Sequence, residues 1–121
     1  MDEKTTVGQL LKKALLFRDE RNWKQFHDPK NLAAALSIEA GELQELFLWK
    51  SKEEVQTFIR SNKGRRRVGE EIADVFIYLL FLSDSIGLDL SLAFEGKLLK
   101  NGGKYPVEKS RGSNKKYDEL E

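Results

Sequence analysis

The chain has 121 residues, a length that suits one domain around one hydrophobic core. A net charge of +1 argues against a strongly basic nucleic-acid-binding protein, and the lack of cysteine excludes disulfides and thiolate metal sites. No apolar run approaches membrane-spanning length, and the first residues lack the order of a secretory signal. We therefore expect a single cytoplasmic domain over residues 1–121, with no nucleic-acid or membrane partner.

Helix-start signals appear early in the chain. Thr6 and Gln9 have the spacing of a capping box and predict a first helix over about residues 7–23. Asp28 has the place of an N-cap, followed by a proline at the first helical position. This boundary predicts a second helix that extends to about residue 50.

Three further helices are predicted, two of them from similar signals. Ser51 with Glu54 opens a short helix, and Asp89 is placed to cap the last one. The expected ranges are residue 52 to about 62–64, about 66–86, and about 90–100.

The segment after the last helix is rich in glycine and charge. Gly102 and Gly103 resemble a helix C-terminal cap, and residues 105–121 are expected to form an extended or partly ordered tail. The fold class that follows is all-α, a bundle of about four to five helices.

The second helix carries a carboxylate where a core residue is expected. An α-helix turns about 100° per residue, so one face collects apolar side chains. Glu39 lies in the middle of that face and Glu42 at its edge, whereas Glu45 points away. The apolar members of the face are Leu32, Leu36, Leu43, Leu46 and Phe47. Because an ionised carboxylate on such a face is costly unless it is compensated, a cation is needed there.

The helix over residues 66–86 repeats this anomaly. It is apolar nearly all round, which is typical of a central helix, and Asp74 is the only charge within IADVFIYLLFL. Glu71 lies about one turn before Asp74 and Tyr78 one turn after it, so the three share a side.

Two acidic pairs, Glu39 with Glu42 and Glu71 with Asp74, therefore suggest one joint metal site between two antiparallel helices. Hard divalent cations such as Mg²⁺ prefer oxygen ligands, and Mg²⁺ usually takes further ligands from substrate phosphates. The chemistry indicated is metal-assisted attack of water on a phosphoryl centre. A di-iron bundle is disfavoured because the only histidine, His27, is in no Glu-x-x-His pair.

Each of these features also has a purely structural interpretation. One Glu-x-x-Glu on a helix is usually a solvated face, and Tyr78 can be a buried tyrosine with a bonded hydroxyl. Trp23 and Trp49 can be core or interface aromatics. His27 is typical of a loop histidine, and residues 65–67, three arginines without interleaved aromatics, make a poor nucleic-acid signature.

The sequence resembles the MazG-like superfamily of all-α nucleoside triphosphate pyrophosphohydrolases, and most closely its dCTP pyrophosphatase group. The resemblance covers most of the chain from Phe17 to Tyr117. The matching stretches are FRDERNWKQFHDPKNL, SIEAGELQELFLWK, EEIADVFIYLLFL and KLLKNGGKYPVEKSRGSNKKY. The E-x-x-E and E-x-x-D motifs on two helices are specific to the superfamily, and the flanking motifs narrow the match to the group.

The resemblance implies a role for each matching residue. The catalytic and metal-binding set would be Glu39, Glu42, Glu71 and Asp74, with Mg²⁺ as cofactor and Mn²⁺ as an alternative. Base and sugar would be held by Trp23, Trp49 and Tyr78, and triphosphate oxygens by Lys97, Asn101 and Lys104. Lys104 stands where relatives often have arginine, so it lacks the bidentate fork.

The implied activity is hydrolysis of a nucleoside triphosphate to the monophosphate and pyrophosphate, with dCTP or a modified dCTP as the expected substrate, in nucleotide-pool sanitation. The family also implies a homo-oligomer, either a dimer or a tetramer. Two alternatives stay open: a less selective dNTP pyrophosphatase, and a non-catalytic helical oligomerisation module whose acidic cluster binds metal structurally.

Overall fold

The computed structural model describes residues 1–121 and contains helices without strands, which confirms the all-α prediction. The α-helices are α1 (Val7–Glu20), α2 (Pro29–Glu45), α3 (Lys52–Arg60), α4 (Asn62–Ser85), α5 (Leu90–Lys104) and α6 (Val107–Ser110). Two short 3₁₀ helices, η1 (Lys24–Phe26) and η2 (Tyr117–Glu119), complete the set. The chain divides into two compact units, Met1–Leu88 and Asp89–Glu121, so the single-domain expectation stays a prediction.

The predicted N-caps form the expected hydrogen bonds. Thr6 and Ser51 each complete a capping box, and the Asp28 side chain accepts a hydrogen bond from the Asn31 N–H. α1 ends at Glu20, earlier than expected, because the chain leaves the helix there through a turn. α2 likewise ends before residue 50.

The boundary between α3 and α4 differs from the prediction. The Asn62–Gly64 segment, expected to end α3, is the first turn of α4, and Ser61 is both the C-cap of α3 and the N-cap of α4. The Ser61 hydroxyl accepts a hydrogen bond from the Gly64 N–H at 3.0 Å and donates to the Phe58 carbonyl at 2.7 Å. A Cβ on Gly64 would overlap the Phe58 carbonyl, so glycine here allows a close corner and does not stop a helix.

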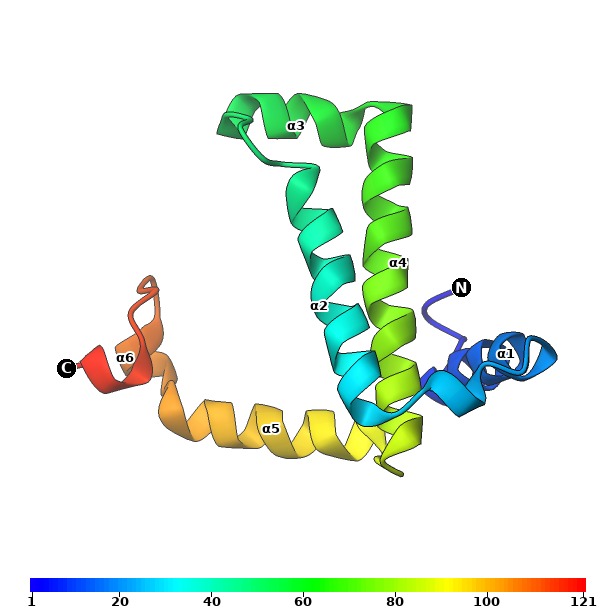
Figure 1. Cartoon of the computed structure of the whole chain (residues 1–121). Helices are drawn as coiled ribbons and strands as arrows, with labels where there is room; N and C mark the ends of the chain where they lie inside the picture. The colour runs from blue at the N-terminus through cyan, green and yellow to red at the C-terminus, as the bar shows by residue number, and fades with distance from the viewer. The chain divides into compact units, whose positions relative to one another are not determined.

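In the first unit, α4 is the central helix. α2 lies along it, and α3 and α1 also pack against it (Figure 1). The buried apolar side chains are Leu32 on α2, Leu46 at the C-cap of α2, and Leu80 and Phe81 on α4. Burial of these side chains between α2 and α4 fixes the register of the two helices, and that register positions the acidic residues.

A buried ion pair joins α1 to α4. The Arg18 side chain is 6% exposed, and its Nη1 donates to the Asp84 carboxylate at 3.0 Å. Its Nε donates to Asp19 at 2.8 Å, so both sides of the guanidinium are bonded. A buried charge with two carboxylate partners resists displacement, and α1 is thereby held at one position on α4.

The second unit consists of α5 and the segment after it. Asp89 caps α5 as predicted, but Gly102 and Gly103 lie inside the helix, which ends with Tyr105 as its C-cap. The segment expected to be an extended or partly ordered tail contains α6 and η2, and the Tyr105 and Tyr117 rings meet edge to face at 6.1 Å. No single helix of the chain is long and apolar enough to cross a membrane.

Candidate active site

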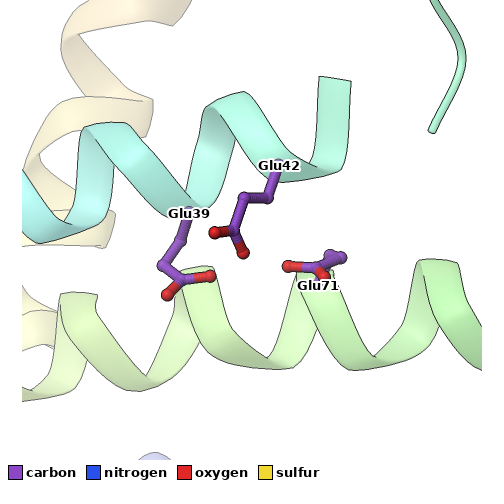
Figure 2. A group of neighbouring side chains, drawn as sticks. All are labelled: Glu39, Glu42 and Glu71. Carbon is purple, nitrogen blue, oxygen red and sulfur yellow. The ribbon is translucent and has the colours of Figure 1, made fainter. Parts of the chain in front are cut away.

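Three carboxylates from two helices meet on the facing sides of α2 and α4. Glu39 and Glu42 come from α2 and Glu71 from α4, and one oxygen of each lies within 4.8 Å of the others (Figure 2). Glu39 and Glu71 are half-buried and Glu42 is exposed. Asp74, on α4, is half-buried and lines the same cavity as Glu39. The pairing of α2 with α4 thus collects acidic groups that are far apart in the sequence.

The electrostatics of this group disfavour full ionisation. Burial, together with the neighbouring carboxylates of Glu42, Asp74 and Glu71, raises the pKa of Glu39 to about 7. Burial also raises the pKa of Glu71 above its usual value, with Glu42 and Asp74 as further causes. Carboxyl groups that cannot all ionise together indicate that the protein itself does not supply enough positive charge to neutralise them.

No side chain supplies the missing positive charge. The four ion pairs of the chain involve Arg18, Arg21 and Arg66, and none of them includes a carboxylate of the acidic group. The Oε2 atoms of Glu39 and Glu71 are buried and have no hydrogen-bond partner. An all-oxygen donor set with unpartnered oxygens fits a hard divalent cation, which would satisfy both atoms and lower the raised pKa values.

A cavity of about 560 Å³ opens beside the acidic group. Glu39 and Asp74 lie on its wall, and most of the remaining lining is aliphatic or aromatic: Leu10, Ala14, Phe17, Trp23, Ala73, Phe76, Ile77, Tyr78, Leu80 and Phe81. Lys13 is its one cationic lining residue. A cavity of this size with a charged end and an apolar body suits a ligand that is itself part charged and part aromatic.

Two of the three predicted base-binding aromatics line this cavity. Trp23 lies just before η1 and is 42% exposed, and Tyr78 is half-buried on α4. Burial, followed by the nearby carboxylates of Glu39, Asp74 and Glu42, raises the pKa of the Tyr78 hydroxyl, which therefore stays protonated. The structure brings these two aromatics to the acidic group, and leaves their substrate roles as predictions.

The other predicted substrate-binding residues keep their roles as predictions. Trp49 is 93% exposed, has a positive φ of 63°, and does not line the cavity. Lys97, Asn101 and Lys104 belong to α5 in the second unit. The Lys104 ammonium lies 4.6 Å from the centroid of the Tyr117 ring, a cation–π contact within that unit.

Sequence reasoning did not single out Phe17, Lys13 or the role of Arg18. Phe17 is one of several apolar residues of α1, and the structure places it on the cavity wall. A cation one residue off the apolar face, as Lys13 is, gives no sequence signal. The His27 ring packs on Phe81 at 4.7 Å, so this histidine is a partly buried packing residue.

Comparison with known proteins agrees with this geometry. The model of the MazG-like family matches residues 34–120. The chain is 46% identical over 104 residues to dCTP pyrophosphatase 1 of Rattus norvegicus and 44% identical to that of Homo sapiens. Each alignment covers 86% of this chain and 61% of the relative, so the chain spans about three fifths of the length of these relatives.

A solved structure supports the same assignment. The crystal structure of a pyrophosphatase from Archaeoglobus fulgidus superimposes with a TM-score of 0.75 at 46% sequence identity. The match covers 82% of this chain and 91% of that one. With a family model that covers all four acidic residues and a fold shared at this identity, the chain belongs to the MazG-like family.

Proposed function

We propose that this protein is a divalent-metal-dependent nucleoside triphosphate pyrophosphohydrolase, with Mg²⁺ as the cofactor and Mn²⁺ as a substitute. The observation that carries the proposal is the meeting of Glu39, Glu42 and Glu71 beside a mostly apolar cavity, with none of the three in an ion pair. The names of the relatives, dCTP pyrophosphatase 1 and a pyrophosphatase, support the same reaction class.

The acidic group would hold the metal through Glu39, Glu42, Glu71 and Asp74. When bound there, a divalent cation supplies charge neutralisation for the phosphate oxygens and lowers the pKa of water. A carboxylate oxygen that is not a metal ligand is then available to orient the attacking water and accept its proton. The products are a nucleoside monophosphate and pyrophosphate, since the bond cleaved is the one between the α- and β-phosphates.

The cavity would receive the nucleoside part of the substrate. Trp23 and Tyr78 supply aromatic surface for base and sugar, and the apolar lining excludes water from one side of the nucleotide. Trp49, Lys97, Asn101 and Lys104 keep their predicted roles in substrate binding. The substrate we propose is dCTP or a modified dCTP, which makes the enzyme a cytoplasmic sanitiser of the nucleotide pool that works as a homodimer or homotetramer.

Two other functions are compatible with the same cluster. A less selective dNTP pyrophosphatase would use the same acids with weaker discrimination in the cavity. A non-catalytic oligomerisation module would bind metal without turnover. The cavity favours the enzyme, because a structural metal site needs no adjoining space of about 560 Å³.

The experiment is a product assay over the common dNTPs and NTPs plus 5-methyl-dCTP, with Mg²⁺, with Mn²⁺ and with chelator. We expect pyrophosphate and the monophosphate from a cytosine deoxynucleotide, and no product with chelator. Similar rates with all dNTPs would favour the less selective enzyme. Metal binding without turnover of any nucleotide would favour the structural module.

A further inference from the structure

Trp23 follows a specific helix ending. After α1 the Trp23 N–H donates to the Arg18 carbonyl at 3.1 Å, and the Asn22 N–H donates to the Asp19 carbonyl at 3.1 Å. Asn22 has a φ of 54°, in the left-handed region. This is the pattern of a Schellman motif, in which one left-handed residue reverses the chain and fixes the direction of the residue after it. Here the residue after it is the cavity tryptophan.

Side-chain packing completes the motif. The Phe17 and Trp23 rings meet edge to face, with centroids 5.8 Å apart and an interplanar angle of 73°. Both rings line the cavity, and both are partly exposed, at 47% and 42%. An exposed pair of rings would sample several rotamers unless something held it.

Arg21 is placed to hold that pair. Its guanidinium carbon lies 3.6 Å from the centroid of the Phe17 ring and 6.0 Å from that of Trp23, within the range of a cation–π contact. Its Nη1 also donates a hydrogen bond to the Phe17 carbonyl at 2.9 Å, which fixes the guanidinium over the Phe17 ring. The Gln25 side chain donates to the Asn22 carbonyl at 2.9 Å and ties the turn to η1.

The turn is fixed relative to the acidic helices. Arg18, whose carbonyl accepts the Trp23 N–H, makes the buried ion pair with Asp84 on α4. α4 also carries Asp74 and Tyr78, which line the same cavity. The contacts that link Asp84 to Arg18 and Arg18 to Trp23 therefore determine where the Phe17 and Trp23 rings lie relative to the acidic group.

We propose that Arg21 and Asn22 are positioning residues that hold Phe17 and Trp23 ready for the nucleotide. The inference rests on the proposed function, since it assigns these two residues to substrate affinity at that same site. When the Phe17 and Trp23 side chains are already ordered, less of their conformational entropy is lost when the nucleotide binds. Loss of the arrangement therefore raises KM, while kcat, set at the acidic group, changes little.

Steady-state kinetics with dCTP test this through matched variants of the full chain. Asn22→Val disfavours a positive φ, whereas Asn22→Gly permits it without a side chain. We expect KM to rise about fivefold in Asn22→Val and in Arg21→Ala, a change equivalent to about 1 kcal/mol, and to stay near the wild-type value in Asn22→Gly. Arg21→Lys, which keeps the charge without the planar fork, should lie between. Lys12→Ala removes a cation from the same helix with no aromatic contact and serves as the control.

A second readout does not depend on turnover. The chain has two tryptophans, so Trp49→Phe leaves Trp23 as the only indole. In that background, we expect acrylamide to quench Trp23 fluorescence more strongly after Arg21→Ala or Asn22→Val, and unchanged after Asn22→Gly. Stronger quenching would show that the Trp23 ring is no longer held in place.

The outcomes separate the inference from the function on which it rests. Raised KM with near-constant kcat, rescue by Asn22→Gly and matching changes in quenching support the positioning role. An active wild-type enzyme whose KM and quenching are unaffected by Arg21→Ala and Asn22→Val overturns the positioning role alone. A fall in kcat that parallels a loss of thermal stability, without a KM change, also overturns it. A wild-type protein that turns over no nucleotide overturns the proposed function itself, whatever the quenching shows.

Discussion

Glu39 is the side chain on which the account of the site depends. It lies on the apolar face of α2, it is half-buried, and its Oε2 has no hydrogen-bond partner. Burial raises its pKa to about 7, so near neutral pH a large share of the molecules hold a proton there when no cation is bound. A divalent cation would replace that proton, and metal binding and protonation at Glu39 are therefore linked.

This linkage predicts how stability depends on pH in metal-free protein. Since the folded-state pKa of Glu39 is raised, its contribution to stability is present below the unfolded value and is lost as pH rises through about 7. We expect the metal-free Tm to be about 5 °C lower at pH 8 than at pH 5.5. Calorimetry of wild type and Glu39→Gln checks this, because the variant should lose the share of the slope that Glu39 contributes. Glu71, whose pKa burial also raises, contributes a slope of the same sign in both proteins. Burial lowers the pKa of His27, which makes stability rise with pH. This opposite contribution is the same in both proteins. An equal slope in both would contradict the assignment.

Trp49 combines an exposed ring with an unfavourable backbone. A φ of 63° in a large side chain costs about 1 kcal/mol, and the ring is 93% exposed, so nothing in this chain offsets the cost. We expect Trp49→Gly to leave the Tm equal or higher while KM for dCTP rises. Calorimetry and steady-state kinetics on the same sample check both parts. If KM is unchanged, Trp49 is not a substrate-binding residue.

Among the glycines, Gly64 at the corner between α3 and α4 has the closest backbone neighbour. Ser61 serves both helices, and Gly64 leaves room for the Phe58 carbonyl. Because α4 carries Glu71 and Asp74, the angle at this corner affects where the acidic residues of α4 lie against α2. A substitution at this corner should therefore shift α4 and, with it, the acidic residues of the site.

Gly64→Ala tests the corner against a matched control on the same helix. The added methyl group would overlap backbone, so we expect a loss of about 2 kcal/mol in the free energy of unfolding. Gly69→Ala places a methyl group where nothing lies within 4 Å and should stabilise α4 by about 1 kcal/mol. Denaturant unfolding of both variants gives the two values. A Gly64→Ala protein as stable as wild type would mean that the corner is not close-packed.

Local signals in the sequence predicted most helix starts, and the acidic pairs, but not every helix end. The side chains of Thr6, Asp28 and Ser51 each accept a hydrogen bond from the backbone N–H three residues later, so their effects can be read from short spacing. Gly64 was interpreted as a stop because glycine is common at helix ends, whereas here it serves a contact with Phe58 that only the folded chain reveals. The contact of Phe17 with Trp23 likewise depends on the left-handed turn at Asn22, which has no strong sequence mark.

For the molecule as a whole, the apolar side chains exceed what one chain buries. On α5, Leu92 is 73% exposed and Leu99 is 81% exposed, and in the first unit Ile38 and Ile72 are 63% and 53% exposed. Exposed apolar surface on this scale is a common feature of subunits that associate. The family resemblance led to the expectation of a dimer or tetramer, and these faces give that expectation a physical basis.

Light scattering coupled to size-exclusion chromatography checks the oligomer. We expect a mass that is two or four times that of the 13.9 kDa chain, stable over a tenfold dilution from about micromolar concentration. The variant Leu92→Gln leaves the net charge unchanged. It should shift the population toward smaller species if α5 lies in the interface between subunits. A single 13.9 kDa species at every concentration would contradict the proposed homo-oligomer.

The most direct test of the central claim is pyrophosphate release from dCTP with Mg²⁺, compared between wild type, Glu39→Gln and Glu45→Gln. Glu45 is on the same helix and exposed, so its variant controls for loss of one charge. We predict pyrophosphate with dCMP from wild type and Glu45→Gln, and a rate lower by about 100-fold or more from a folded Glu39→Gln protein. Equal rates from Glu39→Gln and wild type would contradict the claim that the carboxylates between α2 and α4 perform the reaction.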